Sequence, residues 1–488
     1  MKMSLLHQKR ACQLAVLFVF FPSIAPAQLI SVRSVPVATV EQFLLAPSQN
    51  LGMGGVSIAL EDPSADPFVN PAKGGRIRGV YLFSAPVFGN VTENNGGVRT
   101  LPLGALLGSS RWFGGMSLAV QQLSAPDRFN FISSLAEKNT NNLYAAGLLG
   151  KKLPASGISL AASASWAELQ AMPGVDFLYS RSSRIEQSGH IADYRVGLLY
   201  EKARQPSFEM LLLHNRVRMA HDIYYQSWFW EGDLIANRNS TQIVRELDQT
   251  DTWGLHVGSM IPLRNAGSRA GLIFTANRKS HPKIPNYELM NIPRDPGTSW
   301  VFNFGAGLAH ATDSSAFGMD LIFEPIWSHT WADAAEPLRN ERGEVIIPAG
   351  SKTVENYFHF NNALVRLGLS GQGKTFGFQL GLQARFIHYR LKQTNFVFDT
   401  YRSQKEFWAE WTPSFGLNLN FAPFQIRYTG RLTAGTGQPG VASSGFTRSQ
   451  DLAAASNFII APSGDLTLED AVVLTHQVSV VVKLQSVK

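Results

Sequence analysis

Alternating apolar and polar residues fill most of this 488-residue chain. Between Phe376 and Phe386, every second residue is Phe, Leu or Ala, and the residues between them are Gly, Gln or Arg. Successive side chains of a β-strand point to opposite faces, so a period of two indicates a strand with one apolar and one polar face. The same pattern recurs at 300–308, 317–327 and 407–432. The sequence therefore predicts an all-β protein.

Sixteen strand candidates can be distinguished, many of them about 10–15 residues long, against roughly five or six in soluble proteins. Short turns alternate with long connections, which fill 170–189, 225–250, 280–298, 332–355 and 437–470. Long strands, an even count and this alternation are typical of transmembrane outer-membrane barrels with the short turns in the periplasm. We expect 14–16 antiparallel strands in residues 78–488. The candidates begin near Gly79, Leu101, Gly115, Asn142, Gly157, Ile191, Phe208, Thr252, Arg269, Trp300, Phe317, Tyr357, Phe376, Phe407, Phe424 and Val472.

The polar faces of these strands suit the inside of a barrel, because Gly, Ser, Asn and Gln dominate them and charges are scattered. Charged residues make up only 16% of the chain, which favours a protein with one face in lipid. No run of eighteen apolar residues follows the first 27, so we expect no transmembrane helix. Tryptophans recur near strand ends, where a membrane barrel carries its aromatic girdles. They are Trp112, Trp166, Trp253, Trp300, Trp327 and Trp411.

A secretory leader precedes the strands. Basic residues within 2–10 are followed by an apolar run at 14–21, too short to cross a bilayer, and by the small-residue cleavage site Ala25-Pro26-Ala27. We interpret residues 1–27 as a signal peptide. The only cysteine, Cys12, lies within it, so the mature chain should contain no disulfide and no cysteine nucleophile. Because the leader holds three basic and no acidic residues, its removal lowers the formal net charge from +7 to +4, which gives no support for nucleic-acid binding.

One stretch imitates a nucleotide-binding motif. Gly368 to Thr375 matches G-x-x-x-x-G-K-T, the loop that holds phosphates at the start of a helix. Here a period of two begins at Phe376 instead, so we interpret the stretch as a hairpin turn. His214 and His221 lack the H-E-x-x-H spacing of a zinc site, and no G-x-S-x-G elbow is present. We expect no enzyme, catalytic residue, metal or cofactor, with a Ser/His pair from distant strands as the open alternative.

A glycine-rich turn and three proline pairs follow the leader. Leu51-Gly-Met-Gly-Gly-Val precedes Asp62-Pro63, Asp66-Pro67 and Asn70-Pro71-Ala72. Glycine allows tight turns and close backbone approach, and Asp-Pro and Asn-Pro pairs initiate turns. This segment resembles the amino-terminal hatch of the FadL-type outer-membrane proteins, which include long-chain fatty-acid channels and PorV-like proteins of secretion systems. The resemblance is close over about thirty residues and elsewhere extends only to the barrel pattern, which in that family usually has fourteen strands.

The resemblance implies that residues 28–77 form a hatch in or beneath the barrel. It also implies passive uptake of hydrophobic molecules such as fatty acids through the outer membrane of a Gram-negative-type bacterium. A PorV-like accessory protein that binds a secreted protein or a translocon, and a structural barrel without a solute, are the alternatives. The partners are then outer-membrane lipid, a hydrophobic small molecule or a protein. The hatch residues are Gly52, Gly54, Gly55, Asp62, Pro63, Asn70, Pro71 and Ala72.

Charged and amide side chains also fall on the predicted inner face. They either neutralise one another in an ion-pair network that fills the lumen, or line a solute path, or hold the hatch. The aromatic run Tyr224 to Trp230 is either a capture patch at the cell surface or part of the outer girdle. The inner-face candidates are Arg195, Asp320, Glu324, Arg366, Gln379, Gln383, Arg385, Glu410, Arg427 and Arg431.

Overall fold

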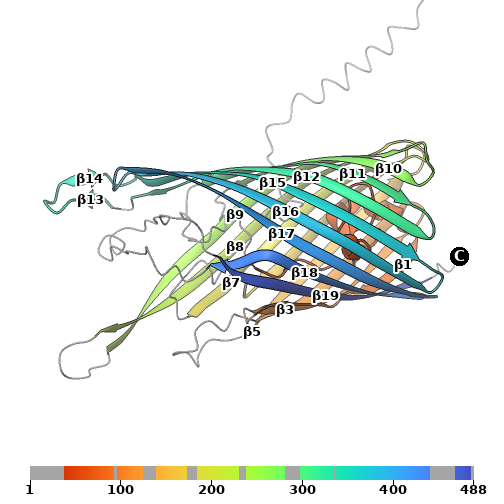
Figure 1. Cartoon of the computed structure of the whole chain (residues 1–488), viewed down its shortest axis with the longest axis horizontal. Helices are drawn as coiled ribbons and strands as arrows, with labels where there is room; N and C mark the ends of the chain where they lie inside the picture. The colour runs from red at the N-terminus through yellow and green to blue at the C-terminus, as the bar shows by residue number, and fades with distance from the viewer. Residues whose placement is uncertain are drawn as a thin grey trace, which may run out of the picture.

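The computed structural model describes residues 38–92, 96–124, 139–172, 184–229, 238–280, 297–334, 336–439 and 468–484. Most of these residues form one antiparallel sheet that closes on itself (Figure 1). The first strand, β1 (Gly79–Ser84), pairs with the last, β19 (Leu468–Leu484), and Phe83 lies opposite Val481. The proposed leader lies outside the described residues.

Between β1 and β19, neighbouring strands of the wall pair in chain order. A separate hairpin, β13 (Leu338–Arg339) and β14 (Val345–Ile347), lies between β12 and β15. The wall strands are β2 (Val87–Val91), β3 (Gly97–Gly108), β4 (Trp112–Ser124), β5 (Asn139–Leu153), β6 (Ile158–Leu169), β7 (Arg184–Tyr200), β8 (Ser207–Phe229), β9 (Arg238–Pro262), β10 (Ser268–Ser280), β11 (Gly297–Ala311), β12 (Ser315–Asp333), β15 (Lys352–Gln372), β16 (Phe376–Asn395), β17 (Thr400–Phe421) and β18 (Phe424–Pro439).

β1 and β2 are two halves of one strand of the wall. Both pair with β3 on one side and with β19 on the other, and the register does not change between Ser84 and Val87. The ladder is interrupted because Pro86 has no amide hydrogen to donate. Counted in this way, the described wall has sixteen strands, one for each strand candidate, which confirms the predicted antiparallel barrel.

The connections differ at the two ends of the barrel. Turns of a few residues, such as 373–375 between β15 and β16, join strands at one end, which we call the short-turn end. Residues 368–375, which match the phosphate-binding motif, are therefore part of a hairpin. At the other end, the predicted loop 225–250 is wrong, because β8 and β9 continue as paired strands to Phe229 and from Arg238. Backbone pairing extends this ribbon, whose sequence lacks the two-residue alternation on which the prediction depended.

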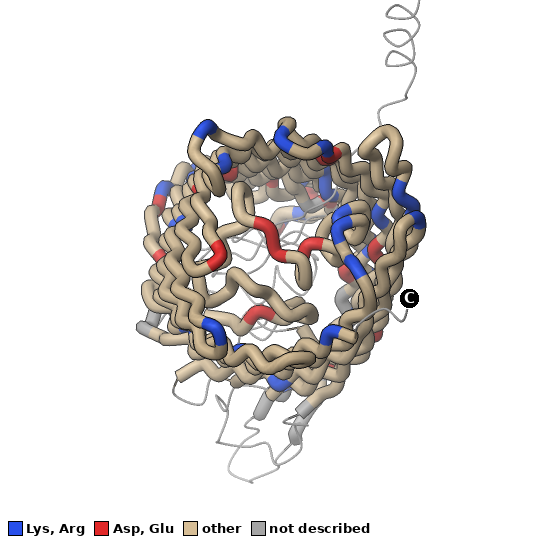
Figure 2. Tube along the Cα trace, turned by 90° about the vertical axis from the view of Figure 1, so that its right-hand side faces the viewer, with Lys and Arg blue, Asp and Glu red and all other residues tan. Residues whose placement is uncertain are grey.

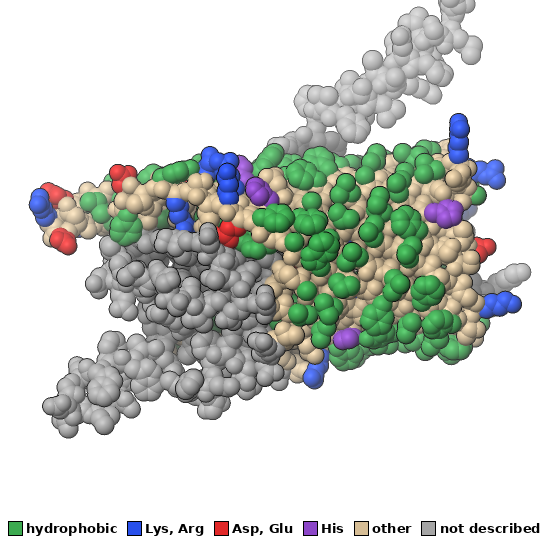
Figure 3. Space-filling model, in the orientation of Figure 1, with side chains coloured by type: hydrophobic (Ala, Val, Ile, Leu, Met, Phe, Trp, Pro, Cys, Tyr) green, Lys and Arg blue, Asp and Glu red, His purple; other side chains and the backbone are tan. Residues whose placement is uncertain are grey.

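The two faces of the wall have opposite character. Phe378 and Leu380 are 48% and 54% exposed on the outer face, whereas Gln379 and Asn418 are buried on the inner face. Apolar side chains are spread over the face of the barrel that Figure 3 shows. Phe376 to Phe386 spans roughly 33 Å of strand, which at the usual tilt gives an apolar band about 25 Å tall. Such a band identifies a transmembrane barrel.

In the part of the chain that the structure describes, no helix is long and apolar enough to cross a membrane.

A single arginine should distinguish the two faces. Leu380→Arg places a charge in the middle of the apolar band and should lower the free energy of unfolding by about 2–4 kcal/mol. Asn418→Arg, on the inner face, should cost much less because its side chain stays among polar groups. Guanidinium unfolding in lipid vesicles, followed by tryptophan fluorescence, measures both values. Equal losses for the two variants would contradict a lipid-facing assignment of Leu380.

Candidate functional site: the segment inside the barrel

Residues 38–77 lie within the barrel, and we call them the hatch segment (Figures 1 and 2). The segment contains three short helical turns, η1 (Leu51–Met53), α2 (Asp66–Val69) and η2 (Pro71–Arg76). η1 contacts β15, β16 and β17, and η2 contacts strands from β3 to β7. The hatch segment therefore crosses the lumen and touches opposite parts of the wall. Of the range 28–77 expected from the sequence, residues 28–37 lie outside the described part of the chain.

The glycine turn packs directly on glycines of the wall. Gly54 and Gly55 have φ values of 71° and 74°, a left-handed conformation that favours glycine. A Cβ atom added to Gly381 of β16 would lie 2.0 Å from the Gly54 amide nitrogen. The Gly54 amide donates a hydrogen bond to Ser414 Oγ (3.0 Å), which donates to the Gly52 carbonyl (3.2 Å). The backbone of the glycine turn is thus in direct contact with the backbone of β16.

A buried carboxylate holds the chain that follows the glycine turn. Asp320 of β12 has no exposed surface and accepts hydrogen bonds from the backbone amides of Ser57 (2.8 Å) and Ile58 (3.3 Å). Arg366 of β15 lies 3.8 Å from the same carboxylate and donates to Ser57 Oγ (3.3 Å). An ionised acceptor makes stronger hydrogen bonds than a neutral one. Asp320 and Arg366 are therefore a clamp on this part of the hatch segment.

The far end of the hatch segment is attached to β7 and β8. Asn70 Nδ2 donates to Glu209 Oε2 (2.8 Å), and Asn70 Oδ1 caps η2 by accepting from the Ala72 amide (3.1 Å). Pro71 takes the first position of η2, where a missing amide hydrogen costs nothing. Ala72 is fully buried in an apolar cluster. Arg195 of β7 donates to the Val69 carbonyl (2.8 Å).

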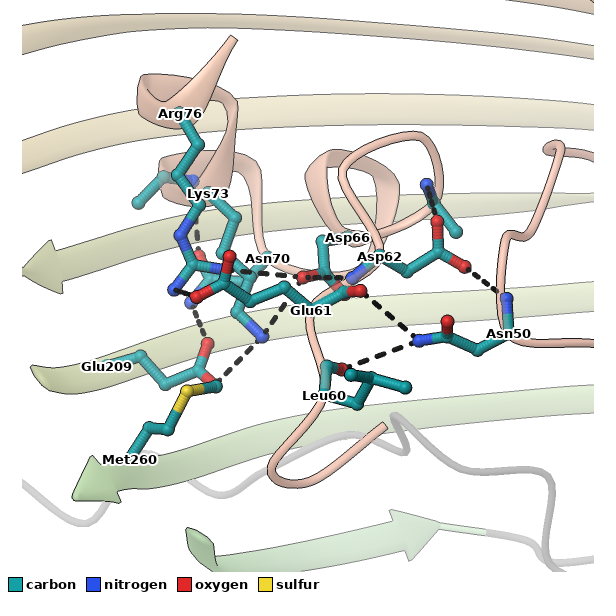
Figure 4. A network of polar contacts seen from close by, with 12 residues as sticks. Asn50, Leu60, Glu61, Asp62, Asp66, Asn70, Lys73, Arg76, Glu209 and Met260 are labelled. Atoms are coloured by element: carbon teal, nitrogen blue, oxygen red, sulfur yellow. Dashed lines mark hydrogen bonds and ion pairs between the residues drawn. The ribbon is translucent and has the colours of Figure 1, made fainter. Parts of the chain in front are cut away.

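The fold within the hatch segment depends on Asp62. Its carboxylate accepts hydrogen bonds from Ser48 Oγ (2.6 Å) and from the Gln49 amide (2.7 Å) on one side. On the other side it accepts from the Ala65 amide (3.3 Å). The adjacent Pro63 has a fixed φ that suits the turn between these contacts. Asp62 therefore joins the two halves of the hatch segment (Figure 4).

A network of charges continues from this point to the wall (Figure 4). Lys73 Nζ lies 2.9 Å from Glu209 and 3.9 Å from Asp66. Arg76 pairs with Asp66 (3.4 Å) and with Glu201, the residue after β7 (2.7 Å). Burial raises the pKa of the Asp66 carboxyl from 3.8 to about 6, and the nearby Lys73 ammonium offsets only part of that rise.

The remaining inner-face candidates lie on the inner side of β15 to β18 and β12. Gln379 donates to the Gln49 carbonyl (2.8 Å), and Arg431 pairs with Glu41 (2.9 Å), so both contact the hatch segment. Glu324 and Arg385 are buried 3.9 Å from each other. The inner-face candidates thus include residues that contact the hatch segment and residues that form an ion pair within the wall. Three further candidates complete the inner layer: Gln383, which accepts from Arg366 Nε (3.4 Å), and the buried Glu410 and Arg427.

Sequence reasoning missed an apolar cluster on the inner face. Its members are almost fully buried and lie beyond the Glu324–Arg385 pair, toward the long-connection end. The signal is a change of phase at Phe386-Ile387, after which the inward residues of β16 are apolar as far as Leu391 and the outward residues are polar. We call this set the inner apolar cluster. It consists of Val301, Ile326, Phe358, Phe360, Ile387, Tyr389 and Leu391, with Trp408 packed against it.

The two histidines considered as zinc ligands point to opposite faces of β8. His214 stacks on the outer Trp253 with ring centroids 4.0 Å apart, whereas His221 is buried on the inner face. Among the described residues, no group of three ligating side chains could hold a metal ion. The side chains of Tyr225 to Trp230 lie outside the description, so the capture patch stays a prediction.

No protein-family model and no curated protein sequence matches the chain. Among solved structures, a FadL homologue from Pseudomonas aeruginosa is similar over 90% of this chain and 99% of that chain, at 9% identity and a TM-score of 0.45. The toluene transporter TbuX of Ralstonia pickettii is similar over 91% of this chain and 100% of that chain, at 9% identity and a TM-score of 0.41. The monoaromatic hydrocarbon channel CymD is similar over 91% of this chain and 99% of that chain, at 10% identity and a TM-score of 0.39. The assignment of a barrel rests on the strand pairing of this chain itself.

Removing the Asp320 carboxylate should loosen the hatch segment without opening the wall. Asp320→Ala deletes two charge-assisted hydrogen bonds, together about 3 kcal/mol. Amide hydrogen exchange at Ser57 and Ile58 should accelerate on the order of a hundredfold. Glu324→Gln changes another buried carboxylate of β12, one with no hydrogen bond to these amides, and should leave their exchange unchanged. Unaltered exchange in Asp320→Ala would refute the clamp.

Acid should tighten the packing around Asp66. A carboxyl with a pKa of about 6 when packed and 3.8 when exposed binds more protons in the packed state, so packing gains stability as the pH falls from 6 to 4. A spin label on Val69→Cys, an exposed hatch position, should report a smaller mobile fraction at pH 4.5 than at pH 7. Asp66→Asn should abolish this dependence. A mobile fraction that grows in acid would show that the sign is wrong.

Proposed function

We propose that this chain is a passive channel for small hydrophobic molecules in the outer membrane of a Gram-negative-type bacterium. The expected leader, the closed wall and the outer apolar band support this location. The short-turn end then faces the periplasm, and the long-connection end faces the outside of the cell. No step of this function requires a catalytic residue.

The observation that carries the proposal is the inverted pattern beyond the membrane band. His388, Arg390 and Lys392 point outward from β16 there, whereas Ile387, Tyr389 and Leu391 point inward. An aqueous pore would have no need of such an apolar inner face, because water and polar solutes are held by polar groups. Apolar and aromatic linings are typical of sites for hydrophobic ligands. The lumen at this level is therefore suited to an apolar solute, which would displace the packing that now buries these side chains.

Residues 47–77 of the hatch segment lie on the periplasmic side of this lining, whereas Ala38 and Val40 pack near the long-connection end against Val91, Val98 and Val473. Ile326 of the inner apolar cluster is six residues beyond the Asp320 clamp along β12, or about 20 Å of strand. A solute that reaches the cluster from outside is thus stopped by the hatch segment, and its further passage requires the segment to move. The polar contacts of Asp320, Arg195 and Gln379 set how tightly the segment is held.

The inner apolar cluster can be tested by uptake. Phe360→Ala with Tyr389→Ala removes two inward rings and should lower entry of a fluorescent fatty acid by about tenfold, because apolar contact area is lost. The matched control is Tyr357→Ala on the outer face of β15. Vesicles with lipopolysaccharide in the outer leaflet and purified protein supply the assay, and a heat-modifiable gel band confirms folding. Equal uptake by the inner and outer variants would refute the channel.

Deletion of residues 46–72 separates the channel from the accessory protein. The wall strands pair without this segment, so the barrel should still fold, and an open lumen should admit small sugars into the same vesicles. Unchanged permeability, together with loss of a secreted-protein partner, would favour the PorV-like alternative.

A further inference from the structure

The outer face of β16 and β17 changes from apolar to basic at a single level. On β16 the outward residues are apolar up to Phe386 and are then His388, Arg390 and Lys392. On β17, Lys405 lies just beyond the outward Phe407. Figure 3 shows Lys, Arg and His side chains gathered where the apolar wall ends. The cations therefore lie at the height of lipid head groups on the cell-surface side.

Three of these cations face one another on adjacent strands. Arg390 is directly opposite Lys405 in the β16–β17 register, and Lys392 is the next outward residue. Side chains directly opposite on one face of a sheet have Cβ atoms about 5 Å apart, and like charges there are destabilising. We call Arg390, Lys392 and Lys405 the basic cluster. Its arrangement costs stability unless an anion lies between the charges.

In the described part of the chain, no protein anion lies in that position. Within the described residues, no ion pair joins the basic cluster to an acidic side chain. The nearby acid on this outer face, Glu355, is engaged by Lys352, by His329 (2.8 Å) and by the Tyr357 hydroxyl (3.3 Å). The basic cluster is therefore available to an external anion.

A second group of cations, on β8, differs from the basic cluster because it has an acidic partner. Arg216 and Arg218 also lie beyond the apolar band on the outer face, but Asp251 of β9 pairs with both, at 3.1 Å and 2.7 Å. There the protein supplies its own counter-charge. On β16 and β17 it does not, although Phe386, Phe407 and Trp411 provide an aromatic surface directly below.

We propose that the basic cluster binds the phosphate groups of a phosphorylated glycolipid of the outer leaflet, such as lipid A, whose acyl chains lie on Phe386, Phe407 and Trp411. Cations at the membrane surface attract anionic head groups, each contributing about 1 kcal/mol. The acyl chains bury apolar area against the aromatic rings. This inference depends on the outer-membrane location and is independent of solute transport.

Native mass spectrometry of the detergent-purified protein with added lipid A tests the proposal. R390Q/K392Q/K405Q should lower the affinity for bisphosphorylated lipid A by about tenfold or more. The control, K202Q/R264Q/K374Q, removes the same charge from exposed positions at the short-turn end and should bind as the wild type does. Dephosphorylated lipid A should bind the wild type as weakly as the phosphorylated lipid binds the triple variant.

Two results would overturn the proposal: equal affinity of the basic-cluster variant and its control, or no preference of the wild type for phosphorylated lipid. Inorganic phosphate at the lipid concentration should leave the adducts in place, and displacement by it would assign the cluster to a free anion instead. Lys405→Gln alone, which removes one of the two opposed charges, should lower the affinity about fivefold and provides the test if the triple variant does not fold.

Discussion

A closed β-wall in a bilayer has to satisfy every backbone hydrogen bond within itself, and the rest of this structure depends on that constraint. Because the strands alternate strictly, the wall presents one face to lipid and the other to the lumen. Sixteen strands enclose more space than the inner side chains can fill. The hatch segment occupies part of this space, and it is attached both by apolar packing, as at Ala72 and Ile58, and by polar contacts to the wall. Asp320, buried and hydrogen-bonded to two backbone amides, is the clearest example.

The same alternation explains what happens outside the bilayer. Once the strands pass the head groups, the outer face meets water and no longer needs apolar side chains. At Phe386-Ile387 the pattern changes phase, and the inner face becomes apolar instead. This change provides the hydrophobic lining on which the proposed channel depends. It also exposes the basic cluster at the membrane surface, so one change of pattern underlies both proposals.

Much of the fold could be predicted from the sequence, because an amphipathic strand needs only its own residues to show its faces. All sixteen strand candidates coincide with wall strands, including the weakly patterned first one, which Pro86 divides. The extension of β8 and β9 could not be predicted, since backbone pairing holds that ribbon without a repeating side-chain pattern. Ser414 and Gly381 were also missed, because their role depends on which strand the glycine turn of a distant segment meets. The inner apolar cluster could be recognised in the sequence by the change of phase at Phe386-Ile387. That change can be interpreted only when the position of the membrane along the strands is known.

The central claim is that a hydrophobic molecule binds inside the barrel, between the outer entrance and the hatch segment. A crystal structure with a brominated fatty acid tests this most directly, because bromine can be located by its anomalous scattering. The account predicts a peak within contact distance of Phe360 and Tyr389 on the inner face, on the outer side of the Asp320 clamp. Bromine found only on the outer, lipid-facing side of the wall, with none in the lumen, would contradict it.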